Sequence, residues 1–285
     1  MRLVRFSVLF IFLFPGGNAI AADWNALVLE SIAKMPEGGV YARFLGAKKG
    51  AARYSHLYRT VEDLSAALAI EGDGRLKVSP KRAKEFSFCS SATYLVFCDV
   101  VASLQAKGGF PVDPAFGREL LDLGTSERVI HGEKDGIGIF GHWNADGPGT
   151  AVLFERLDLG RNFTQIEQAK PGDFLKIFWN DLIGKGEKGH LVVYLGRDED
   201  SGAVHVWSSN LQNEDGSGGY GTIWIERSRI FRMVFSRLER PENLQKWLSF
   251  SGDEKTSGYL VRIRQVPSSE SEMRSATGME GHPSE

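Results

Sequence analysis

The order of the sequence patterns predicts an α+β fold, with helices first and an antiparallel sheet after them. Residues 88–104 carry apolar side chains at helical spacing and contain no glycine or proline, which predicts one long buried helix. From residue 174 onward, short runs alternate between apolar and polar residues and are separated by turn-forming residues, as is typical of strands. Hydrophobic residues make up 42% of the chain, which suits a globular core.

The first 21 residues show the three parts of a signal peptide. Arg2 and Arg5 supply positive charge, residues 8–14 form a short apolar run, and Ala19 and Ala21 provide small residues at a cleavage site. A bilayer span needs about 20 apolar residues. Neither this run nor any later apolar run in the sequence reaches that length. We therefore expect cleavage after residue 21 and a secreted or periplasmic protein with no membrane span. The alternative is a buried N-terminal helix.

The remaining chain indicates one elaborated domain with extensions at both ends. Residues 22–85 suggest an N-terminal helical segment, with apolar residues at helical spacing in two stretches. Residues 267–285 are rich in serine and glutamate and predict a disordered tail. The net charge of −2 gives no global electrostatic reason to expect nucleic acid or an anionic membrane as a partner.

The two cysteines lie on the same predicted helix and should not pair. Nine residues of helix put the Cα atoms of Cys89 and Cys98 about 13 Å apart, whereas a disulfide needs about 4.4–6.8 Å. Cys98 lies mid-helix among apolar residues and suits a small buried hydrophobe. Cys89 opens the helix, where unpaired N–H groups and the positive end of the dipole stabilise a thiolate. Cys89 is therefore a candidate nucleophile, with a structural thiol as the alternative.

The middle of the chain, residues 108–163, is rich in glycine and predicts irregular structure. Its most distinctive stretch, residues 136–150, combines Gly, Asn, Asp and Pro as loops do. Trp143 in this stretch either lines a substrate groove or fills the core. His131 and His142 do not have the spacing of metal ligands, so zinc is not expected.

The strand patterns begin after a Pro-Gly-Asp turn at residues 171–173. Each run is short and bounded by turn residues, and together they predict most of one sheet. The predicted strands are residues 174–179, 189–196, 203–210, 222–226, 230–238 and 259–266.

Three of these features occur in an order that resembles the NlpC and CHAP branch of the papain-like cysteine hydrolases. They are the cysteine that opens a buried helix, the Pro-Gly-Asp turn into a strand, and Gly189-His190 at the start of an apolar strand. The resemblance covers roughly residues 86–210. It implies a papain-like catalytic domain at 86–266, in which the nucleophile helix packs on an antiparallel sheet, with an insertion near 108–170.

The resemblance assigns Cys89 as nucleophile and His190 as general base. His190 also stands out because it begins a strand beside a glycine, on a rigid element. The family's third residue is a polar side chain on the next strand. We expect Asn210, since an amide oxygen can accept the imidazole N–H, while Ser208 on the same face and His205 on the opposite face stay open. Backbone N–H groups, including that of Cys89, would then form the oxyanion hole.

The implied function is cleavage of peptide or amide bonds, most often in cell-wall peptidoglycan, by a thiolate mechanism without a cofactor. A second hypothesis is a catalytically silent papain-like module that binds wall glycopeptide or a protein, with Trp143, Trp179 and Trp207 lining its groove. A third keeps the enzyme but changes the reaction to acyl transfer onto another amine, or to cleavage of a thioester or lipid ester. The sequence does not indicate an oligomeric state.

Overall fold

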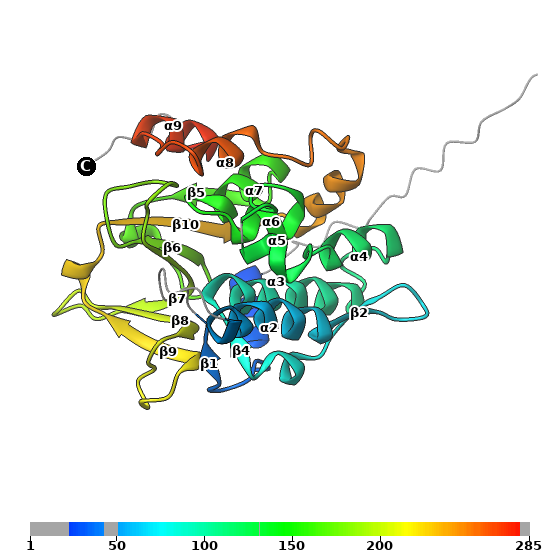
Figure 1. Cartoon of the computed structure of the whole chain (residues 1–285), viewed down its shortest axis with the longest axis horizontal. Helices are drawn as coiled ribbons and strands as arrows, with labels where there is room; N and C mark the ends of the chain where they lie inside the picture. Colours follow the sequence, from blue (N-terminus) through cyan, green and yellow to red (C-terminus); the bar gives the residue numbers. More distant parts are fainter. Residues whose placement is uncertain (1–22, 43–50, 131, 280–285) are drawn as a thin grey trace, which may run out of the picture.

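The computed structural model describes residues 23–42, 51–130 and 132–279, so the predicted signal peptide lies outside the described residues. The fold is α+β: helices form one side of the molecule and an antiparallel sheet forms the other (Figure 1). The described helices are α1 (Trp24–Ile32), α2 (Ala51–Ala67), α3 (Cys89–Ala106), α4 (Pro114–Leu121), α5 (Ser126–Ile130), α6 (Gly138–Asn144), α7 (Gly149–Leu157), α8 (Gly258–Ile263) and α9 (Glu270–Ala276).

Every pairing in the main sheet is antiparallel. In spatial order its strands are β5 (Gly160–Phe163), β10 (Arg232–Leu238), β6 (Phe174–Phe178), β7 (Gly189–Arg197), β8 (Val204–Asn210) and β9 (Gly219–Ile225). Two small pairs accompany it: β1 (Val40–Tyr41) with β4 (Phe86–Ser87), and β2 (Leu68–Ile70) with β3 (Leu76–Val78). Single 3₁₀ segments occur at Pro80–Ala83, Ile166–Gln168, Arg227–Arg229 and Pro241–Ser249.

Helix α3 is the centre of the core, as its apolar pattern predicts. Every side chain from Tyr94 to Cys98 is fully buried. The helix contacts β7 and β8 of the sheet and the helices α1 and α6. Among the described residues, α3 is the one helix long and apolar enough to cross a bilayer, and 78% of it is buried inside the fold, as in the core helix of a globular domain. Both cysteines are free, which confirms that this helix keeps them apart.

The Pro-Gly-Asp turn before β6 is built around a buried carboxylate. Asp173 is fully buried and receives two hydrogen bonds from Arg237 on β10, from Nε at 2.8 Å and Nη2 at 2.6 Å. The backbone N–H of Lys170 and the amide of Asn25 on α1 also donate to it. Gly172 has φ +97°, and a Cβ there would lie 2.6 Å from the backbone oxygen of Asn25. The turn therefore ties the N-terminal helix to the sheet.

The prediction that residues 108–163 are irregular is wrong, because the segment forms α4 to α7 and β5. Its glycines permit close packing rather than loose turns. A Cβ on Gly141 would lie 2.0 Å from the carbonyl oxygen of Lys134, and one on Gly149 would lie 2.1 Å from that of His142. Only residues 145–148 of the glycine-rich stretch connect α6 to α7 as a loop.

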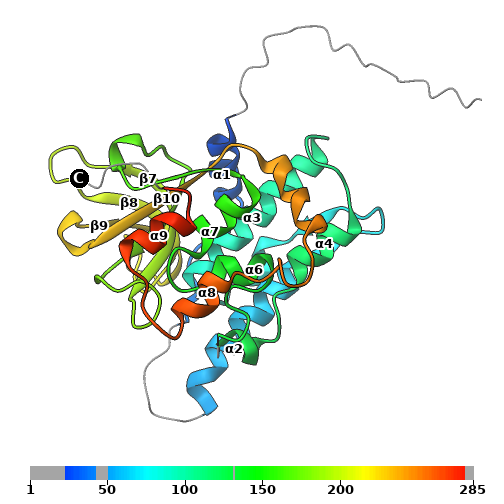
Figure 2. The same cartoon turned by 90° about the horizontal axis from the view of Figure 1, so that it is seen from above.

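Two expectations for the C-terminal part are also wrong. The predicted strand at 259–266 is helix α8, whose Leu260 and Ile263 are fully buried at helical spacing and whose start is capped by Ser257. The predicted disordered tail contains α9, which begins with a capping box and buries Met273 against the core. Figure 2 shows α8 beside α6 and α9 beside the sheet. Residues 280–285 lie outside the described residues.

Replacement of Arg237 by alanine should strongly destabilise the fold, because it leaves the buried Asp173 carboxylate without its cation. Breaking a buried ion pair in this way costs about 3–5 kcal/mol in the free energy of unfolding, which urea denaturation measures. Arg240→Ala is the matched control, since its ion pair with Asp158 is solvent-exposed and is worth about 0–1 kcal/mol. Equal losses in the two variants would contradict this account of the turn.

Candidate active site

Cys89 occupies the first turn of α3, where the local backbone orients its side chain toward the sheet. Phe88 before it is extended, and the Ser91 hydroxyl both accepts from the Phe88 N–H at 3.0 Å and donates to the Phe88 carbonyl at 2.9 Å. These bonds fix the start of the helix. The backbone N–H of Leu191, at the beginning of β7, hydrogen-bonds to the Cys89 sulfur. The thiol therefore lies against the start of the strand that carries His190.

The imidazole of His190 lies within hydrogen-bonding contact of the Cys89 side chain. The residue is 9% exposed, and its ring lies beside two aromatic rings. Trp179 stacks on it with centroids 6.3 Å apart, and Tyr41 meets it edge-on at 6.1 Å. These two aromatic neighbours restrict the orientation of the imidazole.

Asn210, at the end of β8, accepts a hydrogen bond from the second nitrogen of this imidazole. The distance from His190 Nε2 to Asn210 Oδ1 is 2.9 Å, which leaves Nδ1 as the nitrogen that faces the thiol. The amide nitrogen of Asn210 donates to the Gly221 carbonyl at 3.0 Å and to Asn213 Oδ1 at 2.9 Å. Because the Gly221 carbonyl can only accept, this network determines which way the Asn210 amide points.

Ser208 and His205, the alternatives for the third catalytic residue, make their side-chain contacts with other groups. The hydroxyl of Ser208 donates to the Leu191 carbonyl at 2.8 Å, inside the sheet. His205 stacks on Trp224 with centroids 4.4 Å apart and meets Glu214 at 2.8 Å. Of the three residues considered from sequence, Asn210 is the one that contacts His190.

The electrostatics of the pair favour a thiolate and an imidazolium. Burial alone raises the pKa of Cys89, but the hydrogen bond and positive charge of His190 outweigh it and lower that pKa to about 7. Burial alone lowers the pKa of His190, yet its bonds to Cys89 and Asn210 raise it above the ordinary value. Burial raises the pKa of Cys98 far above that of a free thiol. The two cysteines therefore differ sharply in their expected reactivity.

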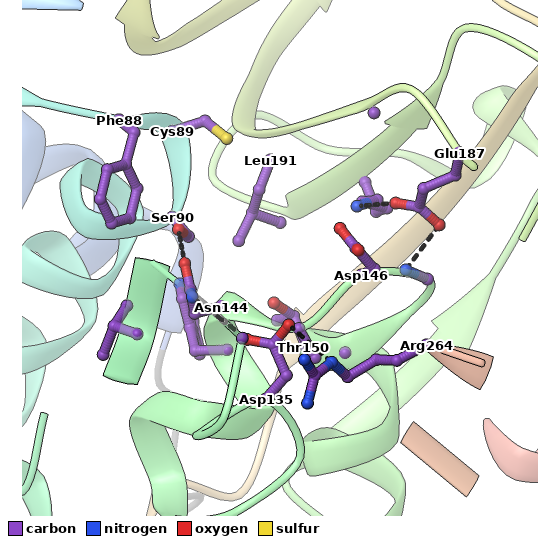
Figure 3. Close-up of a pocket in the computed structure, with 18 of the residues that line it drawn as sticks. Phe88, Cys89, Ser90, Asp135, Asn144, Asp146, Thr150, Glu187, Leu191 and Arg264 are labelled. Atoms are coloured by element: carbon purple, nitrogen blue, oxygen red, sulfur yellow. Dashed lines mark hydrogen bonds and ion pairs between the residues drawn. The ribbon is translucent and has the colours of Figure 1, made fainter. Parts of the chain in front are cut away.

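Cys89 opens into a cavity of about 550 Å³ between α3, the sheet and the α6–α7 loop. In Figure 3, Phe88 and Ser90 lie beside Cys89, while Glu187 and Arg264 lie farther along the cavity. Trp143 reaches the cavity wall but is 1% exposed, and its Nε1–H donates to Thr93 at 3.0 Å. Trp143 therefore fills the core, which decides between the two roles considered for it.

The polar wall of this cavity was missed by the sequence reasoning. Lys176 on β6 pairs with Glu187 at 2.6 Å, and Arg264 approaches Asp135 at 3.6 Å. The signal available in the sequence was Lys176, a charged residue inside an otherwise apolar strand.

A hydrogen-bonded chain connects the nucleophile helix to the same wall. The Ser90 hydroxyl donates to Asn144 Oδ1 at 2.5 Å, and the Asn144 amide donates to Asp135 at 3.3 Å. Burial, assisted by the charge of Asp146, raises the pKa of Asp135 to about 7. Within the described ranges, no group of three or more His, Cys, Asp or Glu side chains has the arrangement of a metal site.

Comparison with protein-family models, with curated proteins and with solved structures found no match.

Cys89 should react with iodoacetamide at neutral pH, while Cys98 in the folded protein should not. The reactive thiolate forms as the pH rises through the pKa, so the alkylation rate should rise with a midpoint near pH 7. In His190→Ala the midpoint should move toward about 8.5, the value of a free thiol, and the rate at pH 7 should fall about tenfold.

Mass spectrometry of the alkylated peptides measures both rates. Cys89→Ala is the control, because the only thiol left in it is the buried Cys98. If the alkylation rate of Cys89 in the unmutated protein already has its pH midpoint at the pKa of a free thiol, the Cys89–His190 contact is contradicted.

Proposed function

We propose that this protein is an exported cysteine hydrolase of the papain-like NlpC and CHAP type, which cleaves peptide or amide bonds with peptidoglycan peptide as its leading substrate class. One observation supports this above all: His190 contacts the thiol of Cys89 and hydrogen-bonds through its other nitrogen to Asn210. A nucleophile, a base and a residue that orients the base are the parts that acyl transfer by a thiol requires.

The papain-like assignment draws support from how the elements bring these residues together. A helix that begins with the cysteine packs on an antiparallel sheet, and adjacent strands of that sheet supply the histidine and the asparagine. The cysteine, the histidine and the asparagine follow one another along the chain in the same order as the family motifs. The added helices α4 to α7 occupy the place of the expected insertion.

In the proposed first step, the Cys89 thiolate attacks the carbonyl carbon of the scissile amide, and His190 carries the proton taken from the thiol. The first N–H groups of α3 have no partner within the helix, so the backbone N–H of Cys89 can donate to the developing oxyanion. As the intermediate collapses, the carbon–nitrogen bond breaks and His190 transfers its proton to the leaving amine.

In the second step, His190 removes a proton from water, and the resulting hydroxide attacks the thioester carbonyl. The carbon–sulfur bond then breaks, which releases the carboxylic acid and restores the thiolate. One water is consumed for each amide cleaved. Asn210 keeps Nε2 of His190 engaged throughout, so that Nδ1 stays directed at the sulfur.

Cys89→Ala should abolish hydrolysis of purified peptidoglycan and change the thermal unfolding midpoint little, because Cys89 is half-buried and lies at a helix end. Mass spectrometry of the released peptides identifies the cleaved bond by the new amine and carboxylate. Cys98→Ala serves as control and should keep activity once its folded fraction is matched. Full activity in Cys89→Ala would disprove the proposal.

Asn210→Ala should lower kcat about a hundredfold, the size of effect expected when a reacting group loses its orientation, with little change in KM. Asn213→Ala should lower kcat by a smaller factor, because Asn213 contacts the amide of Asn210 and not the imidazole of His190. Ser208→Ala is the matched control on the same strand. If Ser208→Ala and Asn210→Ala lower kcat equally, Asn210 has no special role in orienting the imidazole.

A further inference from the structure

The helix that carries the nucleophile begins without a side-chain cap. Phe88, the residue before α3, has no polar side-chain atom, and the Ser91 hydroxyl bonds to the Phe88 backbone instead of to the N–H groups of the first turn. Those N–H groups therefore stay available to an oxyanion. Uncapped helix ends fray readily, so another contact has to hold this turn in place.

Ser90, the residue after the nucleophile, is tied to a different helix. It is 6% exposed, and its hydroxyl donates at 2.5 Å to Oδ1 of Asn144, the last residue of α6. The Asn144 amide nitrogen donates in turn to Oδ1 of the buried Asp135 at 3.3 Å. Figure 3 shows this Ser90–Asn144–Asp135 chain along the cavity wall. Because Asp135 accepts from the amide nitrogen, the amide oxygen is directed at Ser90.

Asn144 stands at a fixed position because the core holds its neighbour. Trp143 is 1% exposed, and its Nε1–H donates to Thr93 of α3 at 3.0 Å. Its ring also lies against Phe97 of α3, with centroids 4.7 Å apart. A side chain on such a rigid element can hold a second group precisely. The Ser90–Asn144–Asp135 chain therefore connects the start of α3 to a well-packed part of the core.

A second tie holds the chain just before Cys89. The hydroxyls of Ser87 and Ser209 hydrogen-bond to each other at 2.7 Å, and both residues are fully buried. Ser209 directly precedes Asn210 on β8. This tie joins the approach to the nucleophile to the strand of the orienting asparagine, whereas the tie at Ser90 holds the chain after the nucleophile. The backbone of Cys89 is thus held on both sides along the chain.

We infer that Asn144 is a positioning residue, which acts through Ser90 to keep the Cys89 thiol in contact with His190, and that Asp135 holds the Asn144 amide in the required orientation. This inference rests on the proposed function, because it takes Cys89 as the nucleophile. Without the chain, the first turn of α3 loses its tie to α6. The thiol and the Cys89 N–H would then lose their fixed position relative to His190.

Replacement of Asn144 by leucine removes both hydrogen bonds at a similar side-chain size. For soluble peptidoglycan fragments, kcat should fall about tenfold, the worth of one hydrogen bond, with little change in KM. The pH midpoint of Cys89 alkylation by iodoacetamide should rise from near 7 toward about 8.5, because the contact with the imidazole weakens. A residue with a merely structural role would change neither quantity in the folded protein.

Asn162→Leu is the matched control. The Asn162 amide on the edge strand β5 also donates to two backbone carbonyls, those of Ala151 and Thr277. Its loss should lower the thermal unfolding midpoint. At matched folded fraction it should change neither kcat nor the alkylation midpoint of Cys89.

Two further sets of variants separate positioning from a general loss of packing. Ser90→Ala should reproduce the losses of Asn144→Leu, and the double variant should lose no more than either single one, because all three break the same tie. Ser90→Thr keeps the hydroxyl and should retain most activity. Burial raises the pKa of Asp135 to about 7, so we expect it to serve mainly as a hydrogen-bond acceptor. Asp135→Asn should therefore retain most activity, whereas Asp135→Leu should behave like Asn144→Leu.

Parent values of kcat and of the alkylation midpoint in Asn144→Leu would overturn the inference. So would losses that add in the double variant, or a rise in KM alone, which would indicate that Asn144 contacts the substrate. If Asn144→Leu does not fold, Ser90→Ala carries the same test, since it removes only a hydroxyl. A midpoint that shifts while even the parent hydrolyses no peptidoglycan would refute the proposed function alone. Hydrolysis by the parent with no effect of either variant would refute the positioning role alone.

Discussion

The contact between the start of α3 and the start of β7 is the constraint on which the site depends. The helix is almost entirely buried, so its position is set by the core and not by the site. Because it packs on β7 and β8, its first residue lies against the strand that carries His190. The low pKa of Cys89 follows from that placement, since burial alone would raise it, and the hydrogen bond and charge of His190, with smaller contributions from the Leu191 N–H and the charge of Lys176, outweigh burial.

The sequence predicted the elements whose signals are local. The periodicity of α3 and the alternation of β6 to β10 identified the central helix and most of the sheet, because a buried helix and a half-buried strand each impose their own repeat. The glycine-rich middle segment misled the prediction. Glycine there reflects contact with a distant backbone, as at Gly141 and Gly149, and nothing in the local sequence distinguishes close packing from a loop.

The candidate site likewise contains residues that the sequence predicted and residues that it could not predict. Cys89 and His190 were predicted from a helix end, a strand start and the order of family motifs. Asn210 was predicted because the family resemblance implies a polar third residue on the next strand, where an amide oxygen can accept the imidazole N–H. The polar wall could not be found, because Lys176 and Glu187 acquire meaning only when β6 and the chain entering β7 are placed side by side. A helix start and an alternating strand are visible in neighbouring residues. An ion pair between distant residues, such as Lys176 and Glu187, exists only in the folded structure.

Glu187 in the polar wall also holds two parts of the structure together. Its carboxylate binds the Lys176 ammonium and two backbone N–H groups, and so joins a strand of the sheet to the α6–α7 loop. The sheet positions His190, and the loop lines the cavity beside Cys89. A displacement of either would have to break buried, charge-assisted hydrogen bonds, which are strong in such surroundings. The proposed base and the α6–α7 loop are therefore held in one rigid frame, which fixes the wall of the cavity relative to Cys89.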